Sequence, residues 1–324
     1  MNNLTILVVG SGSISQRHIK NLKKISSYNK IVLVRRNKSK SELFIKPDVI
    51  VENYKKYPSE KINAVILANP SSFRKEITNY FIKKNKPIFF EKPIANTSYQ
   101  ANSILKIINK NPNNPIMVGY CLRFLKSLNF FKKILSSDKL GKIRSSQIYV
   151  SQYLPLWRKN VKYQDSVSAQ RKLGGGILLE MSHELDYIQW IFGDIKKSTG
   201  HVYRINDLEM NVENHADLIL KTSKDIFINI HLDMLSRYPK RNCIVLCEKG
   251  TVIWDYHKNL VKWKVDGFKE RKKQFSNSEI NEMYIDEMKE FLKMIKNKKA
   301  KPSSIKSSVE ITKIIEKLNT LKIK

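Results

Sequence analysis

Apolar residues run without interruption from Leu4 to Val9, which predicts a strand buried on both faces, as in a parallel sheet. Gly10 and Gly12 follow at once, and Ser15 stands where a third glycine is usual. Apolar positions then recur at helical spacing, together with one histidine: Ile14, His18, Leu22 and Ile25. This pattern predicts either an ordinary strand-to-helix turn or, as we prefer, the first turn of a dinucleotide-binding βαβ unit.

Further apolar runs continue this pattern through the first third of the chain. They predict strands at 31–34, 48–52, 64–68, 87–90 and 116–118, alternating with helices. Such alternation is typical of a doubly wound parallel sheet of the α/β class, the Rossmann fold. Ligands of these sheets bind beyond the carboxyl ends of the strands. We therefore expect the cofactor to contact Gly10, Gly12, Ser13, Ile14, Asn69, Pro70, Ser72, Glu91 and Lys92.

The second half alternates apolar and polar residues with the period of half-buried strands. The predicted strands are 143–150, 201–205, 215–221, 226–235, 242–247, 251–255 and 260–265. They predict a C-terminal α+β domain with a large, open, mainly antiparallel sheet. We place the domains at 1–122 and 123–324, and the last helix can pack back on the first domain.

Composition limits the classes of function. Lysines spread over all segments give a formal net charge of +31, and no nucleic-acid-binding motif accompanies them. This favours a Lys-rich surface over a nucleic-acid partner. No apolar run is long enough for a membrane helix, and the three cysteines form no C-x-x-C pair. We expect a cytoplasmic protein with neither a membrane partner nor a metal site.

Two arginines bear on the choice of cofactor. Arg35 and Arg36 directly follow the second predicted strand, where an acidic residue would bind the ribose of NAD. An arginine there accommodates the 2′-phosphate of NADP. We therefore expect both residues to contact an NAD(P) cofactor and favour NADP(H), although two solvated arginines would give the same pattern.

Lys92 follows the fifth predicted strand within Glu91-Lys92-Pro93. A lysine beside a nicotinamide and a sugar hydroxyl can lower the pKa of the hydroxyl and relay its proton. The alternative is a surface lysine in a Lys-rich chain.

Together with three other segments, this tripeptide makes the chain resemble the glucose–fructose oxidoreductase, inositol dehydrogenase and MocA (Gfo/Idh/MocA) family. The other segments are Val9–His18, Gly119–Phe124 and Gly174–Asp186, in the order that the family has them. The resemblance implies NAD(P)-dependent oxidation or reduction of sugars, inositols or sugar nucleotides. It gives Lys92 a catalytic role, adds Arg123 as a substrate contact, and implies a homo-oligomer, a dimer or tetramer.

A helix predicted from about Ile177 to Phe192 follows three glycines. At 100° per residue, Glu180, His183 and Tyr187 share a stripe away from its core side. The histidine can take a hydroxyl proton as hydride leaves, and a carboxylate can hold its tautomer. We assign Glu180 and His183 as catalytic and His183 and Tyr187 as substrate contacts. The family usually has an Asp four residues before this His, so we align the motif on His183.

Residues 151–173 carry aromatic and basic side chains, among which Tyr153 and Trp157 are predicted to contact substrate. Loop packing explains them equally well.

These predictions describe an oxidoreductase that transfers a hydride between nicotinamide and a ring carbon of a sugar, inositol or nucleotide sugar, in carbohydrate or surface-polysaccharide metabolism. Two alternatives stay open: a non-catalytic, cofactor-binding sensor or regulator, and an NAD-dependent glycosidase.

Overall fold

The computed structural model describes residues 3–26, 29–36, 42–158, 162–298 and 302–321. The chain divides into two compact units. The first contains residues 1–121 and 284–313, and the second contains residues 122–283 and 314–324. The N-terminal segment of the first unit ends within one residue of the predicted boundary at 122, and residues 284–313 cluster with it.

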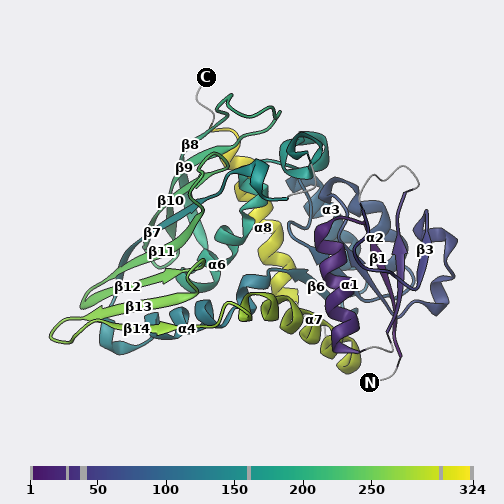
Figure 1. The fold of residues 1–324 in the computed structure, drawn as a ribbon, viewed down its shortest axis with the longest axis horizontal. Helices are drawn as coiled ribbons and strands as arrows, with labels where there is room; N and C mark the ends of the chain where they lie inside the picture. Colours follow the sequence, from purple (N-terminus) through teal and green to yellow (C-terminus); the bar gives the residue numbers. More distant parts are fainter. Residues whose placement is uncertain (1–2, 27–28, 37–41, 159–161, 299–301, 322–324) are drawn as a thin grey trace. The chain divides into compact units, whose positions relative to one another are not determined.

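The first unit is built on a six-stranded sheet in the order β3-β2-β1-β4-β5-β6 (Figure 1). All of its strand pairs are parallel, and this order is that of dinucleotide-binding folds. Its strands agree with the predicted runs to within two residues at each end: β1 Thr5–Val9, β2 Lys30–Val34, β3 Val49–Val51, β4 Ala64–Leu67, β5 Ile88–Glu91 and β6 Ile116–Gly119.

Helices cover this sheet: α1 Ser13–Ile25, α2 Arg74–Ile82 and α3 Ser98–Ile108. The chain steps from β1 to β2 in one direction across the sheet and from β4 to β5 in the other. Right-handed crossovers therefore put α1 on one face and α2 and α3 on the opposite face. Phe291 of α7 (Glu279–Asn297) packs on Phe89 of β5, with ring centroids 5.6 Å apart. Contacts of this kind place residues 284–313 in the first unit.

An eight-stranded sheet forms the second unit, in the order β14-β13-β12-β11-β7-β10-β9-β8. Only β7 and β10 pair in parallel among its described strands. Its strands are β7 Ile143–Ser151, β8 Ile195–Tyr203, β9 His215–Thr222, β10 Phe227–Asp233, β11 Lys240–Cys247, β12 Gly250–Asp255, β13 Leu260–Val265 and β14 Arg271–Gln274. Its helices are α4 Lys126–Leu135, α5 Ile177–Glu180 and α6 Ser182–Phe192, and α8 (Pro302–Leu318) ends in it.

The two faces of this sheet differ in what covers them. Along β9, Ala216, Leu218 and Leu220 are buried on the inner face, whereas Asp217 and Ile219 are exposed on the outer one. Helices α4 and α6 lie over the inner face (Figure 1), and the indole Nε1 of Trp254 donates to Ser127 Oγ of α4 over 3.1 Å. Among the described residues, no helix of this unit lies over the outer face.

Three predictions about elements were wrong. Strand β8 spans Ile195–Tyr203 rather than 201–205, and β14 was missed because its Arg-Lys-Lys-Gln sequence is polar and fully exposed. The helix predicted over 177–192 is divided into α5 and α6 at Met181, whose ψ of 25° interrupts the helical turn. None of the described helices has both the length and the apolar character needed to cross a membrane.

We predict that the buried ion pair between Arg241 and Glu184 stabilises the second unit. Arg241 Nε lies 2.8 Å from Oε1 of Glu184, whose side chain is 0% exposed. Arg241→Met removes the cation and leaves the carboxylate buried, which should lower the free energy of unfolding by about 3–5 kcal/mol. Urea denaturation followed by tryptophan fluorescence measures this unit selectively, because all 4 tryptophans lie in it.

Arg144→Met is the matched control. Arg144 pairs with Glu248 at 3.4 Å, and both side chains are largely exposed, so the change should stay within about 0.5 kcal/mol. Equal losses in the two variants would contradict a special contribution from the buried pair.

Candidate functional site

The glycine turn after β1 leaves the start of α1 open. Gly10 has a φ of +106°, and a Cβ there would lie 2.9 Å from the carbonyl oxygen of Ala68. A Cβ on Gly12, which caps α1, would meet no atom within 4 Å, and no side chain caps the helix. The first turn also lacks an acidic residue. Unblocked N–H groups at a helix N-terminus suit a pyrophosphate, so this turn fits the predicted dinucleotide.

Polar atoms without partners lie at the end of β4 in the same sheet. Within the part of the chain that the structure describes, Oδ1 of Asn69 and Oγ of Ser72 are buried and have no hydrogen-bond partner, although buried polar groups are usually paired. Pro70 between them begins the short turn Ser71–Phe73. Because the carboxyl ends of β1 and β4 are adjacent, these atoms lie at the edge of the sheet where we expect the cofactor to bind. Ser13 and Ile14 begin α1 at the same edge.

Arg35 and Arg36 directly follow β2, as predicted. The guanidinium of Arg36 lies 5.5 Å from the ring centroid of Phe73, in the turn after β4. The backbone N–H of Arg35 donates to the carbonyl of Val51 over 2.8 Å. Arg36 is therefore held at the carboxyl edge of the sheet.

Glu91 is buried at the end of β5, where it contacts a histidine rather than standing open to a ligand. Its Oε1 lies 2.5 Å from Nε2 of His18, a ring that is 0% exposed. Burial raises the pKa of Glu91, but the hydrogen bond from His18 and the charges of His18, Lys92 and Arg74 outweigh it and lower the pKa overall. The lowered pKa favours the ionised carboxylate next to Lys92, so Glu91 can position this segment; its contact with the cofactor stays a prediction.

Arg74 fixes the backbone on both sides of Lys92. This arginine, 3% exposed, donates to the carbonyls of Glu91 and Pro93, the latter over 2.6 Å. It also donates twice to the carbonyl of Asn69, over 2.7 and 3.1 Å. Burial lowers its pKa to about 10, so it stays charged at neutral pH. One side chain thereby ties the end of β4 to the Lys92 segment, and no sequence signal marked it among many basic residues.

In the second unit, the glycines before α5 approach other groups of their own unit closely, backbone at Gly175 and a side chain at Gly176. A Cβ on Gly175 would lie 2.2 Å from the carbonyl oxygen of Val167, and one on Gly176 would lie 2.1 Å from Oε1 of Glu213. Ser168 Oγ donates to Oε1 of Glu180 over 2.7 Å. The glycines therefore allow this loop to pack, and the packing fixes Glu180.

The predicted stripe of Glu180, His183 and Tyr187 is not continuous. The break at Met181 puts Glu180 in α5 and the partly exposed His183 in the first turn of α6. Tyr187 is 0% exposed and its ring packs edge-on against Trp254, with centroids 5.7 Å apart. The prediction that Tyr187 lies away from the core was wrong, and its burial argues against contact with a substrate.

Arg123 binds the carboxylate of Asp186 on α6 through both arms of its guanidinium, over 2.8 and 2.7 Å. Burial raises the pKa of Asp186 to about 6, while Arg123 opposes the shift. The pair orients the segment after β6 against α6, three residues beyond His183. Asp186 ends the sequence motif Gly174–Asp186, but its spacing in the sequence did not identify Arg123 as its partner.

Trp157 contributes to a hollow in the second unit, whose lining is Leu154, Trp157, Arg158, Tyr163 and Ser166. Tyr153 is outside this lining, and the guanidinium of Arg237 lies 4.0 Å from its ring centroid. The structure thus brings Trp157 together with Arg158 and Tyr163 and pairs Tyr153 with Arg237.

Two models of one protein family together match most of the chain. The description "Oxidoreductase family, NAD-binding Rossmann fold" applies to the match over residues 4–120. The description "GFO/IDH/MocA C-terminal domain" applies to the match over residues 129–253.

Curated relatives include dehydrogenases of sugars and inositols. Glucose-6-phosphate 3-dehydrogenase of Bacillus subtilis (strain 168) is 25% identical over 69% of this chain and 65% of its own length. Inositol 2-dehydrogenase of Serratia proteamaculans (strain 568) is 24% identical, over 76% of this chain and 72% of its own. These names describe what the relatives do.

Solved structures share the fold over nearly the whole chain. Levoglucosan dehydrogenase in complex with NADH has a TM-score of 0.84 at 15% identity, covering 99% of this chain and 97% of that one. The myo-inositol 2-dehydrogenase of Lactobacillus plantarum has a TM-score of 0.79 at 20% identity, with the same coverage.

The glycine turn gives a paired prediction. Gly12→Ala should leave the melting temperature unchanged, since φ at Gly12 is −72° and its Cβ meets nothing. That Cβ would stand where the pyrophosphate approaches, so NADH should bind at least about tenfold more weakly, or about 1.4 kcal/mol. Fluorescence titration with NADH and a thermal melt measure the two effects.

Gly10→Ala is the contrasting variant. Its positive φ and its contact with Ala68 should lower the melting temperature and weaken NADH binding together. If Gly12→Ala bound NADH normally, the cofactor would not approach this turn.

Proposed function

Since the chain belongs to the Gfo/Idh/MocA family of NAD-binding oxidoreductases, we propose that it is a dehydrogenase of sugar-like ring alcohols. Hydride passes between nicotinamide and a ring carbon of a sugar, inositol or nucleotide sugar, in carbohydrate or surface-polysaccharide metabolism. The sugar and inositol dehydrogenases among its relatives support this substrate class.

The network around Lys92 is the observation that carries the proposal. The residues before and after Lys92 have their carbonyls held by Arg74, and the carboxylate of Glu91 accepts the backbone N–H of Lys92 over 3.2 Å. This ordering lies at the carboxyl edge of the sheet, where ligands of such folds bind. Holding a lysine this firmly suits a residue that positions a hydroxyl group for proton transfer.

We assign a separate role in the oxidation to each of Lys92, His183, Glu180 and Arg123. A nicotinamide at the carboxyl edge of the first sheet would supply the hydride acceptor for the oxidation of a ring alcohol to a ketone. We assign to Lys92 the stabilisation of the substrate hydroxyl oxygen as it loses its proton, and to His183 the role of accepting that proton. Glu180, fixed by Ser168, supports the catalytic histidine, and Arg123 fixes α6 through Asp186. The indole of Trp157 and the guanidinium of Arg158, neighbours at this hollow, are groups that contact a sugar ring and an anionic substituent at a protein surface.

We assign a preference for NADP(H) to the arginines after β2. Arg36 is held over Phe73 at the carboxyl edge of the sheet, and neither position carries an acid that would repel a 2′-phosphate. A guanidinium binds a phosphate through two charge-assisted hydrogen bonds.

The outer face of the eight-stranded sheet supports a homo-oligomer, a dimer or tetramer. Ile219, Phe227 and Leu246 lie on this face and are 48%, 51% and 48% exposed. Large apolar side chains on an open sheet are typical of protein interfaces. A single species of monomer mass in analytical ultracentrifugation would exclude this assembly.

Lys92→Met tests the catalytic proposal. Removing the ammonium should lower kcat by about 10²–10⁴-fold, whereas NADPH binding should persist because the glycine turn is untouched. His183→Gln should lower kcat in the same range for the loss of its base. Steady-state assays on a panel of sugars, inositols and nucleotide sugars, with absorbance of the reduced cofactor, give these values.

Lys106→Met, an exposed lysine of α3, is the control and should keep full activity. Undiminished turnover in Lys92→Met would refute the catalytic role of Lys92. Turnover of a glycoside without net reduction of cofactor would favour the NAD-dependent glycosidase, and cofactor binding without any turnover would favour the sensor.

Arg35→Ala with Arg36→Ala tests the cofactor preference. Losing a charged contact costs about 1.5–3 kcal/mol, so NADPH should bind roughly ten- to a hundredfold more weakly, while NADH binding stays unchanged. Arg271→Ala with Lys272→Ala removes the same charge from β14 of the second unit and should affect neither cofactor. Equal weakening of both cofactors in the first pair would mean that the arginines do not recognise the phosphate.

A further inference from the structure

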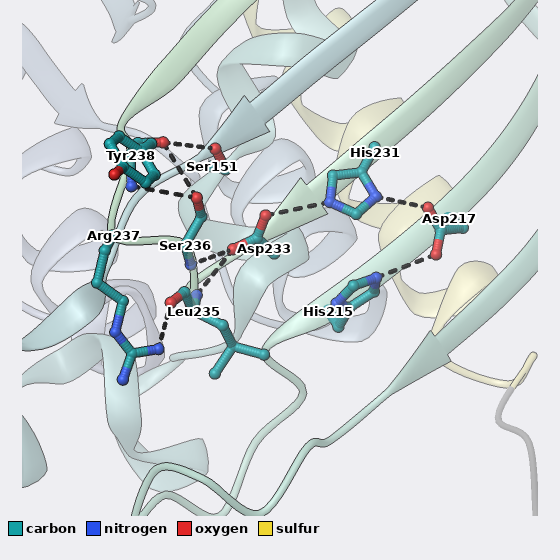
Figure 2. A network of polar contacts seen from close by, with 9 residues as sticks. All are labelled: Ser151, His215, Asp217, His231, Asp233, Leu235, Ser236, Arg237 and Tyr238. Carbon is teal, nitrogen blue, oxygen red and sulfur yellow. Dashed lines mark hydrogen bonds and ion pairs between the residues drawn. The ribbon is translucent and has the colours of Figure 1, made fainter.

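A compact group of imidazoles and carboxylates lies on the outer face of the eight-stranded sheet (Figure 2). It comes from two adjacent strands, β9 with His215 and Asp217, and β10 with His231 and Asp233. The register pairs Asp217 with His231 and His215 with Asp233. All four side chains therefore share one face, opposite to the buried Ala216 and Leu218 and thus to the side that the helices cover.

Asp217 lies between two imidazole rings that both turn toward it (Figure 2). Its Oδ1 is 2.7 Å from Nδ1 of His231, and its Oδ2 is 3.0 Å from Nε2 of His215. Donor atoms from these three residues lie within 4.8 Å of one another. One carboxylate between two imidazole nitrogens is a set of ligands that zinc and similar divalent ions accept.

A neutral imidazole ring at His231 cannot donate a hydrogen bond to both of the carboxylates that its nitrogens face. Its Nδ1 faces Asp217, and its Nε2 lies 3.1 Å from Oδ2 of Asp233. A neutral ring carries a single N–H, so one nitrogen then meets a carboxylate with its lone pair. A second proton removes this conflict, and so does a metal cation placed between Nδ1 and Asp217.

Asp233 contacts the ring nitrogen of His231 that faces away from Asp217, as a supporting carboxylate does for a metal-binding histidine. It is 3% exposed, and its Oδ1 accepts the backbone N–H groups of Leu235 and Ser236 over 2.8 and 2.7 Å (Figure 2). Histidines that bind metals usually donate their other ring N–H to such an anchored carboxylate, which fixes the tautomer. Here that bond leaves Nδ1 of His231 as the atom available to a cation.

Aromatic neighbours hold both rings in place. Tyr149 of β7 stacks on His231 with centroids 4.4 Å apart, and Tyr203 of β8 stacks on His215 at 4.5 Å. The two imidazoles are themselves edge to face at 4.8 Å. Stacking from four neighbouring strands reduces the freedom that the ligands would lose on binding, which favours affinity.

We propose that His215, Asp217 and His231 bind a divalent transition-metal ion of the zinc class, with Asp233 orienting His231. Three protein ligands leave a fourth position for water. Bonds of about 2.0–2.1 Å put tetrahedral ligand atoms about 3.3 Å apart, so the donor atoms approach one another by about 1.5 Å at most. Asp217, 51% exposed, is free enough at the surface to make this adjustment. The ion joins β9 to β10 on the face opposite to α6.

The test uses the untagged full chain after dialysis against EDTA. Wild-type protein should retain one zinc per chain in equilibrium dialysis, measured by elemental analysis, and its melting temperature should rise when ZnCl₂ is added. CoCl₂ should produce a visible d–d absorption band, and ZnCl₂ should abolish it. MgCl₂ should cause neither effect, because imidazole nitrogen is a poor ligand for magnesium.

His231→Gln and Asp217→Asn should each weaken zinc binding by at least about tenfold, since even changes to supporting residues commonly do so. His257→Gln is the matched control: this exposed histidine follows β12 in the same unit, and the variant should bind zinc as wild type does. Far-ultraviolet circular dichroism without zinc confirms that each variant folds.

Failure of the wild-type chain to retain zinc would overturn the proposal and leave a set of hydrogen bonds between the histidines and carboxylates of β9 and β10. Retention by His231→Gln and Asp217→Asn at wild-type affinity would overturn it as well, by placing the ion elsewhere. If one of these two variants does not fold, the other and the His257→Gln control decide the outcome.

Discussion

A single buried guanidinium organises the ligand edge of the first unit. Arg74 starts α2, yet its donors reach back to Asn69 after β4 and to the carbonyls on both sides of Lys92 after β5. Each hydrogen bond from a charged donor contributes about 1.5–3 kcal/mol to the free energy of unfolding. A carbonyl that stayed buried without its donor would lower that free energy by a similar amount. The backbone around Lys92 is therefore set by the core of its own unit, before any ligand binds.

The contact between His18 and Glu91 extends this order to the cofactor turn. His18 is in α1, the helix whose open N-terminus suits a pyrophosphate, and Glu91 precedes Lys92. The rings of Phe89 and Tyr284 pack edge-on against the imidazole. The start of α1 and the segment of Lys92 are thus joined by a buried hydrogen bond within the first unit.

Sequence periodicity was sufficient for the parallel sheet, for most strands of the second sheet and for the place of the glycine turn. Buried parallel strands are continuous apolar runs, as at Ala64–Leu67, and such runs are hard to mistake. Periodicity failed where the backbone departed from ideal geometry. A single residue, Met181, interrupts the helix, and the stripe calculated through it wrongly put Tyr187 away from the core. Exposed, polar β14 had no apolar face to reveal it.

Side-chain partnerships across strands could not be derived from spacing. The sequence placed His18 among the apolar residues of a helical stripe, which indicates that its ring is buried and needs a polar partner. Nothing in the sequence identified that partner as Glu91, which is 73 residues away. The cluster at His215 and His231 is similar, since its members become neighbours only through the register of β9 with β10. Cysteine spacing led to the prediction of no metal site, and that criterion says nothing about imidazoles brought together by a sheet. The same alternation that buries Leu218 necessarily turns Asp217 outward beside them, so the core packing of this sheet also determines the chemistry of its open face.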